Sequence, residues 1–157
     1  MNGVSETLFA PESDITRAMF VTVLHRMEGA TEAAEGYTFD DVSSDAYCSE
    51  AVAWASENGI VEGFSAEEFG PDISITREQM AAIIYRYARY KGYDLTASYM
   101  PGYSDAESIS EYAREAVAWA ADKGVMNGND DNTFAPLANS TRAQAAAVFE
   151  RIRENLR

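Results

Sequence analysis

A threonine–arginine pair occurs at three places in the chain, within ITRAM (15–19), ITREQ (75–79) and STRAQ (140–144). Each pair precedes an apolar pattern of helical spacing, so the threonine is predicted to cap a helix and the arginine to occupy its first position. The partial positive charge at a helix N-terminus makes a cation there mildly unfavourable. Three arginines in this position therefore suggest a role of their own: Arg17, Arg77 and Arg142.

Such an arginine has the chemistry to bind a carboxylate. The first N–H groups of a helix have no partner within the helix, and a guanidinium offers parallel donors to the two oxygens of a carboxylate. We therefore expect Arg77 and Arg142 to contact an anionic ligand, and Arg17 is a third candidate for such a contact. The alternative for each arginine is a salt bridge to a loop carboxylate: Asp14, Asp72 or Asp131.

Two of the helix starts carry a second cap. Thr76 and Thr141 are each followed three residues later by a glutamine, which predicts a capping box, whereas Met19 at the corresponding place after Thr16 cannot complete one. These caps should hold the helix without the arginine. Because an arginine in the first turn is expected to lie on the surface, replacing Arg77 or Arg142 should cost only a few tenths of a kcal/mol of folding stability, but about 1.5–3 kcal/mol of binding.

The same order of residues recurs at shifts of 60 and then 65 positions. Each threonine–arginine helix has an apolar stripe, predicted to be buried. A shorter helical pattern precedes two of these helices, over 47–60 and 112–125, with Gly59 and Gly124 placed to end it. The sequence therefore predicts an all-α, mostly helical fold of tandem helix–loop–helix repeats with pseudo-threefold repetition. The predicted stripes are Phe20, Val23, Leu24 and Met27; Met80, Ile83, Ile84 and Tyr87; and Ala145, Val148, Phe149 and Ile152.

The repeats divide the chain into a partial first repeat (1–30, second half only), a second repeat (37–92), a linker (93–102) and a third repeat (103–157). Because the first repeat is truncated, we expect this segment to be a piece of a larger, secreted protein, near its C-terminus. The alternative is self-association, in which another chain supplies the missing first helix.

Composition excludes several classes of function. The net charge of −14 over 157 residues argues against nucleic-acid binding and against adsorption to anionic membranes. No apolar run is long enough to insert into a membrane. The loop 127–138 has calcium-like spacing at its start but lacks the glycine and the glutamate of such a loop, so no metal and no cofactor are predicted. No nucleophile or phosphate-binding motif is present, which predicts a protein that is not an enzyme.

The repeated segments resemble the S-layer homology family. The second repeat contains FDDV (39–42), YCSEAVAWA (47–55), NGIVEG (58–63) and FGPDISITREQ (69–79). The third contains YSDA, YAREAVAWA, KGVMNG and FAPLANSTRAQ in the same order, and FAPESDITRAM (9–19) is the remnant of the first. The family's early tryptophan is replaced by Tyr47 and Tyr112, and the glutamate of its Thr-Arg-Ala-Glu motif by methionine or glutamine.

The resemblance implies a compact, three-lobed helical domain that anchors bacterial surface proteins to the cell wall. The ligand that it implies is an acidic secondary cell-wall polysaccharide, often with pyruvyl ketals, held in grooves between repeats by the motif arginine. It implies separate grooves for Arg77 and Arg142, and a groove with an incomplete wall for Arg17. It implies an extracellular location, at the cell wall or S-layer. The alternative function is a protein-interaction or assembly module of a bacterial surface protein.

Six further residues are candidates for ligand binding through this resemblance. Thr76 and Thr141 stand beside the arginines. Trp54 and Trp119 are expected to pack in the core, with stacking on a sugar as the alternative. Gly63 and Gly128 are expected to be turn glycines, with close approach of a glycan as the alternative.

Overall fold

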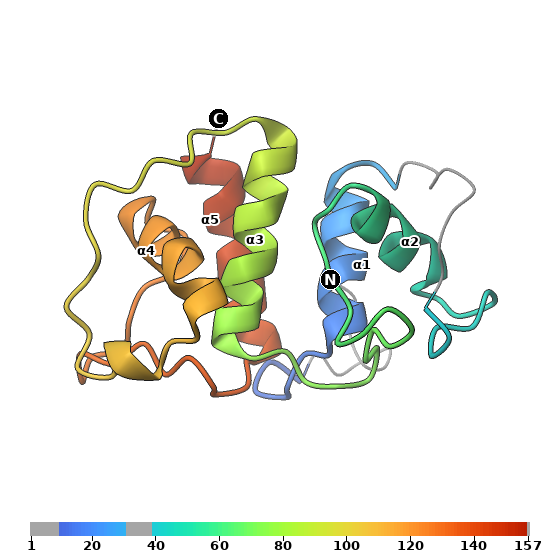
Figure 1. Cartoon of the computed structure of the whole chain (residues 1–157), viewed down its shortest axis with the longest axis horizontal. Helices are drawn as coiled ribbons and strands as arrows, with labels where there is room; N and C mark the ends of the chain where they lie inside the picture. The colour runs from blue at the N-terminus through green and yellow to red at the C-terminus, as the bar shows by residue number, and fades with distance from the viewer. Residues whose placement is uncertain (1–9, 31–38, 157) are drawn as a thin grey trace.

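The computed structural model describes residues 10–30 and 39–156. Within these residues the chain is helical and has no β-sheet, only three isolated bridges, which confirms the all-α prediction. In Figure 1, α3 stands beside α5, while α2 and α4 lie on opposite sides of the molecule. The elements are α1 (Arg17–Met27), α2 (Ser49–Glu57), α3 (Arg77–Lys91), the 3-10 turns η1 (Ala106–Ser108) and η2 (Glu111–Ala113), α4 (Arg114–Asp122) and α5 (Arg142–Asn155).

The three long helices begin as the sequence predicts. Thr16, Thr76 and Thr141 are N-caps, and each hydroxyl accepts the N–H of the third residue that follows, at 3.2–3.3 Å. α3 and α5 have complete capping boxes. At the ends of α2 and α4, Gly59 and Gly124 have φ values of +64° and +66°, which favour glycine.

Each short helix packs against the long helix of the preceding repeat. α2 packs on α1, and α4 packs on α3. A tryptophan lies in each contact: the Trp54 ring is 5.1 Å from the His25 ring, and the Trp119 ring is 5.5 Å from the Tyr85 ring. The repeats are therefore interlocked, because each completes the helix pair of its neighbour.

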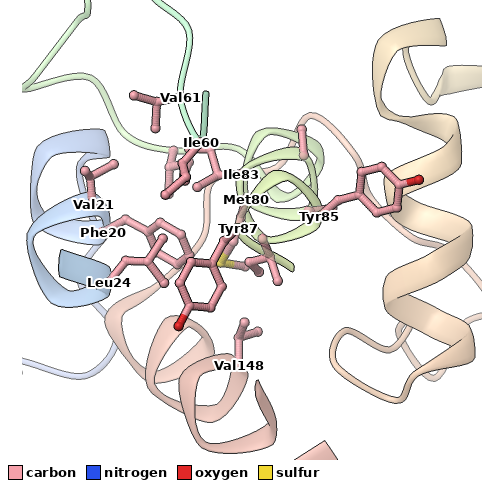
Figure 2. Close-up of a cluster of buried hydrophobic side chains, with 14 of the residues drawn as sticks. Phe20, Val21, Leu24, Ile60, Val61, Met80, Ile83, Tyr85, Tyr87 and Val148 are labelled. Atoms are coloured by element: carbon pink, nitrogen blue, oxygen red, sulfur yellow. The ribbon is translucent and has the colours of Figure 1, made fainter. Parts of the chain in front are cut away.

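The core lies between the long helices. Figure 2 shows Phe20 and Leu24 of α1 facing Met80 and Tyr87 of α3, with Val148 of α5 closing the cluster. The predicted stripes are buried, except that Val23 and Met27 are only partly covered. Burying a side chain of this size stabilises the fold by about 1.5–3 kcal/mol.

The residues before the three threonines form a closed ring of hydrogen bonds. The Ile15 N–H donates to the Ser140 carbonyl at 3.0 Å, the Ser140 N–H to Ile75 at 2.9 Å, and the Ile75 N–H to Ile15 at 3.0 Å. All three threonine–arginine segments therefore meet at one place, each bound to both others. This local pairing repeats three times, whereas the three-lobed shape stays a prediction.

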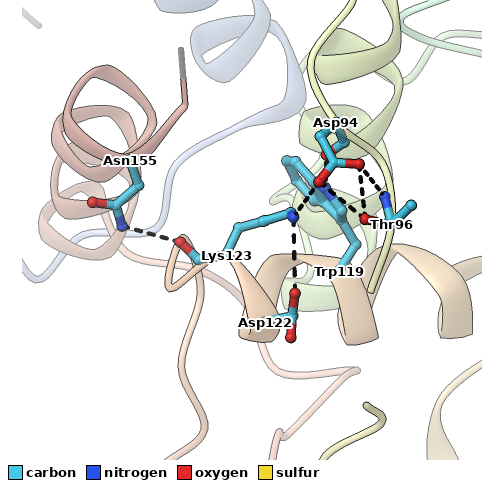
Figure 3. Close-up of polar contacts among 6 residues, drawn as sticks. All are labelled: Asp94, Thr96, Trp119, Asp122, Lys123 and Asn155. Carbon is cyan, nitrogen blue, oxygen red and sulfur yellow. Dashed lines mark hydrogen bonds and ion pairs between the residues drawn. The ribbon is translucent and has the colours of Figure 1, made fainter. Parts of the chain in front are cut away.

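The predicted linker between the second and third repeats is fastened to α4 (Figure 3). The Trp119 indole N–H donates to the Asp94 carbonyl at 3.0 Å, and the Lys123 ammonium donates to the Asp94 carboxylate at 2.8 Å. The bond from Lys123 and those from Thr96 hold the pKa of Asp94 below its usual range. The linker therefore fixes how α3 leads into the third repeat.

Candidate functional site

The three motif arginines are buried, which corrects the expectation that they lie on the surface. Only 5% of Arg17, 7% of Arg77 and 5% of Arg142 is exposed. Burial lowers the pKa of the Arg17 and Arg77 guanidinium groups, but an arginine stays protonated at neutral pH. A buried cation needs several fixed acceptors, so the partners of these side chains decide their role.

Each of the first two arginines reaches into the loop of the next repeat. Arg17 donates from Nε to the Phe69 carbonyl and from Nη2 to the Glu62 carbonyl, both at 2.9 Å. Its guanidinium also lies 4.6 Å and 4.7 Å from the centres of the Phe64 and Phe69 rings. The alternative of a salt bridge to a loop carboxylate is therefore wrong for Arg17, whose partners are carbonyl groups and aromatic faces.

Arg77 repeats this arrangement one repeat later. Its Nε donates to the Phe134 carbonyl at 2.7 Å and its Nη2 to the Asn127 carbonyl at 2.9 Å, with the Phe134 ring 4.9 Å away. The salt-bridge alternative is wrong here too. Both arginines fasten one repeat to the next, because their donors end on backbone that belongs to the following loop.

The free helix N–H groups of the predicted anion site are occupied. At the start of α1, the Arg17 N–H donates to the Ile73 carbonyl at 2.9 Å and the Ala18 N–H to the Pro71 carbonyl at 3.1 Å. The first two N–H groups of α3 and α5 have the same kind of partner: Ala138 and Pro136 for α3, and Ser13 and Pro11 for α5. The proposed combination of guanidinium and unpaired N–H groups is therefore wrong, because neighbouring loops already satisfy the helix starts.

Sequence reasoning missed two aspartates that shape these loops. The Asp41 carboxylate accepts the N–H groups of Phe69 and Gly70 at 2.8 Å and 2.7 Å. Asp105 does the same for Phe134 and Ala135. The sequence contained a signal, since both aspartates lie in the repeated FDDV and YSDA segments. Each aspartate thus fixes the residue whose carbonyl receives an arginine Nε.

An open groove of about 330 Å³ lies beside Arg17. Nε and one Nη2 N–H of Arg17 have carbonyl partners among the described residues, which leaves Nη1 for the groove. A second cation, Arg86 of α3, binds Glu62 at 3.1 Å, although the Glu62 side chain is 76% exposed. The residues around the groove are Arg17, Glu62, Gly63, Phe64, Gln79, Ala82, Ile83, Arg86 and Tyr112.

The Arg17 groove has walls from the loop 62–64, from α3 and from Tyr112, so the expectation that its wall is incomplete is wrong. The corresponding pocket beside Arg77 is smaller, about 120 Å³, and has Arg151 in place of Arg86 but no counterpart of Tyr112. Near Arg142, Nη1 lies 4.0 Å from the Met19 sulfur. The loop that would complete the Arg142 groove by analogy is 1–9, outside the described residues.

Comparison with known proteins gives the family. A family model described as the S-layer homology domain matches residues 38–81 and 102–146, which together exceed half of the chain. The chain belongs to the S-layer homology family. The two matched segments fall on the second and third repeats predicted from the sequence, and the helical structure is consistent with the match.

Relatives of this S-layer homology chain include enzymes and surface proteins. An amylopullulanase of Thermoanaerobacterium thermosulfurigenes is 37% identical over 95% of the chain, which spans 8% of that protein. A surface-layer 125 kDa protein of Lysinibacillus sphaericus is 34% identical over 94% of the chain, or 12% of its own length. A cellulosome-anchoring protein of Acetivibrio thermocellus is 28% identical over 96% of the chain, or 34% of its own length.

The chain thus spans between 8% and 34% of the length of these three relatives. The S-layer homology domain is an anchoring domain, and the family and these relatives point to the cell wall or cell surface. In the part of the chain that the structure describes, no helix is both long and apolar enough to cross a membrane.

The remaining motif residues of the S-layer homology repeats have structural roles. Trp54 and Trp119 are buried in the core, so packing is their observed role and their ring faces are closed to a sugar. A β-carbon at Gly63 would overlap the Phe39 ring and the loop carbonyls, and one at Gly128 would overlap the Tyr103 ring. Of these residues, only Gly63 lines the Arg17 groove. The hydroxyls of Thr76 and Thr141 serve as helix caps.

Proposed function

We propose that this chain is a non-catalytic anchoring module that binds an acidic cell-wall polysaccharide in the groove beside Arg17. The observation that carries the proposal is the pairing of Arg17 and Arg86 in one open groove of a protein with a net charge of −14. A local pair of cations can hold an anion against the field of distant carboxylates, because salt screens charges beyond about 8–10 Å.

Arg86 is the cation with the most freedom to receive a carboxylate. Its present partner Glu62 is largely exposed, and a surface ion pair of this kind contributes only about 0–1 kcal/mol. A carboxylate on a sugar would replace Glu62 and gain a forked contact. Arg17 would add a second charge from Nη1, while Phe64 and Tyr112 offer aromatic faces to the sugar ring.

Changing Arg86 to glutamine is expected to weaken binding of a pyruvyl-ketal hexosamine by about 1.5–3 kcal/mol, because one charge-assisted contact is lost. The matched control is Arg89→Gln, which makes the same change of charge three residues along α3, outside the residues that line the groove. Isothermal titration calorimetry measures both, with the ketal-free sugar as the ligand control. Equal losses in the two variants would show that general charge, and not this groove, holds the acid.

We propose that the pocket beside Arg77 is a weaker site of the same kind. Arg151 takes the place of Arg86 there, and Gln144 that of Gln79. The smaller volume and the lack of an aromatic wall limit its contact with a sugar. We propose a direct ligand contact for Arg142 as well, in a third groove.

A second candidate function is assembly, and one observation favours it. A groove of about 360 Å³ runs between α1 and α5, lined by Val23, Met27, Ala146, Phe149, Glu150 and Arg153. On α1 and α3, the positions equivalent to Ala146 are the fully buried Val21 and Ala81, which belong to the helices covered by α2 and α4. We propose that this groove receives a helix of the α2 type from a second copy of the chain.

A synthetic peptide of residues 46–60, which contains α2, is expected to bind this groove. A Trp54→Ala peptide should bind at least tenfold more weakly, because the tryptophan is buried and its ring packs on His25 of α1. Placing a large charged side chain in the groove with Ala146→Arg should likewise prevent binding. Fluorescence anisotropy measures the peptide, and light scattering the size of the parent. Assembly through this face would be refuted if the parent stays monomeric at all concentrations and does not bind the peptide.

A further inference from the structure

Glu78 is a buried carboxylate that only one of the three long helices carries. It occupies the second position of α3, where α1 has Ala18 and α5 has Ala143. Only 3% of Glu78 is exposed. Burying a charge is costly unless it is hydrogen-bonded, so this carboxylate must have specific partners.

The partners of Glu78 all come from the start of the third repeat. Its carboxylate accepts the Ser110 N–H at 3.0 Å, the Ser110 hydroxyl at 2.7 Å and the Tyr112 hydroxyl at 3.2 Å. The positive end of the α3 dipole also favours a negative charge at this place. Glu78 therefore binds the turn η2 to the first turn of α3 through three contacts.

Tyr112 is the residue through which this contact reaches the groove. It lines the same groove as Arg17 and Arg86, and the ring remains largely exposed. Burial of its hydroxyl end, together with the charge and the hydrogen bond of Glu78, raises the pKa of Tyr112 to about 12. The phenol is therefore protonated at neutral pH and remains a donor to Glu78.

We propose that Glu78 is a positioning residue that fixes Tyr112 as the aromatic wall of the Arg17 groove, and thereby makes this groove the dominant glycan site. The inference rests on the proposed function of the groove. It explains why the pocket beside Arg77, which has no tyrosine among its lining residues, offers a poorer surface to a sugar. A ring held in place loses less entropy when a sugar stacks on it.

Glu78→Ala is the first test. The helix is expected to form in this variant, because α1 and α5 both have alanine at their second position. Its affinity for a pyruvyl-ketal hexosamine is expected to fall about three- to tenfold, the effect of one or two lost contacts. The affinity of Tyr112→Ala should fall by a similar factor. The affinity of the double variant should fall no further, because both changes remove the same wall of the groove. Tyr99→Ala is the matched control, because it removes an exposed tyrosine that lies in the linker and outside the residues that line the groove.

The second readout is the ring carbon chemical shift of Tyr112 at neutral pH, assigned through Tyr112→Phe. It reports the hydrogen bond to Glu78 and is expected to move in Glu78→Ala and stay unchanged in Arg89→Gln, which changes a charge of α3 outside the groove. Glu78→Gln, which keeps an acceptor oxygen, should restore part of both the shift and the affinity.

The outcomes separate this inference from the proposed function. If the parent does not bind the ketal sugar, the proposed function fails and the inference fails with it. If the parent binds and Arg86→Gln does not, while Glu78→Ala moves the Tyr112 signal without loss of affinity, the inference alone is wrong. Tighter binding by both Glu78 variants would also overturn it, since Glu78 would then act only as a repelling charge.

Discussion

Replacing Arg77 with alanine is expected to lower the free energy of unfolding by about 3–5 kcal/mol, a large fraction of the stability of a small domain. This replaces the few tenths of a kcal/mol expected from the sequence, because the side chain is buried. The reason is the burial of its partners. The carbonyls of Phe134 and Asn127 would lose their charged donor, and each unsatisfied buried acceptor costs about 1–3 kcal/mol. The guanidinium also stacks on the Phe134 ring, so its removal leaves a void between two repeats.

Urea unfolding followed by circular dichroism measures this change. Arg77→Lys should recover only part of the loss, because an ammonium cannot reach both carbonyls with a planar fork. Arg151→Ala is the control. It removes a half-buried cation from the same pocket and is expected to change stability by no more than about 0.5 kcal/mol. Equal stability of Arg77→Ala and the parent would mean that the arginine is free to act as a pure ligand contact.

The local elements could be predicted from the sequence because their signals are local. Thr76 and Gln79 are three residues apart, and the capping box that they predict is present. Gly59 follows an apolar helical pattern, and it has the left-handed backbone expected there. The repetition also predicted the family. Each motif is weak by itself, but the motifs recur in the same order and at the same spacing.

The partners of the arginines could not be predicted in the same way. Arg17 binds residues 45 and 52 positions away, and nothing in the sequence shows which loop lies over a helix start. Repetition relates equivalent residues to each other but does not show that the repeats interlock. The same limit applies to Glu78. The equivalent residues of the other two repeats are Ala18 and Ala143, which give no reason to expect a buried carboxylate at this position. Its role depends on Ser110 and Tyr112, which pack there from the next repeat.

Asp41 and Asp105 are a third case. The sequence motifs that contain them were recognised, but the role of the two carboxylates was not predicted. Asp105 occurs in YSDA, 29 positions before the loop that it holds. From the sequence, an aspartate at the start of a repeat is predicted to be a helix cap or a turn residue. Only the fold brings its carboxylate to the N–H groups of Phe134 and Ala135, and so to the carbonyl that Arg77 needs.

The contacts that lead from Asp105 through Phe134 to Arg77 predict a second large loss of stability. Asp105→Ala is expected to lower the free energy of unfolding by about 2–4 kcal/mol, because two hydrogen bonds to a charged acceptor are lost together. Asp105→Asn should lose about half as much, since an amide keeps one acceptor oxygen and cannot accept both N–H groups. Asp130→Ala, an exposed acidic residue of the neighbouring loop, is the control for the change of charge.

Asp105 and Arg77 act on the same residue, so their effects should not add. Asp105 holds the N–H of Phe134, and Arg77 holds its carbonyl and stacks on its ring. Once either is removed, the loop moves and the other loses much of its contact. In a double-mutant cycle measured by urea unfolding, we expect the loss in Asp105→Ala/Arg77→Ala to fall short of the sum of the single losses by about 1–3 kcal/mol. Strict additivity would contradict this, because it would mean that the loop keeps its position without the aspartate and that the two repeats are joined by independent contacts.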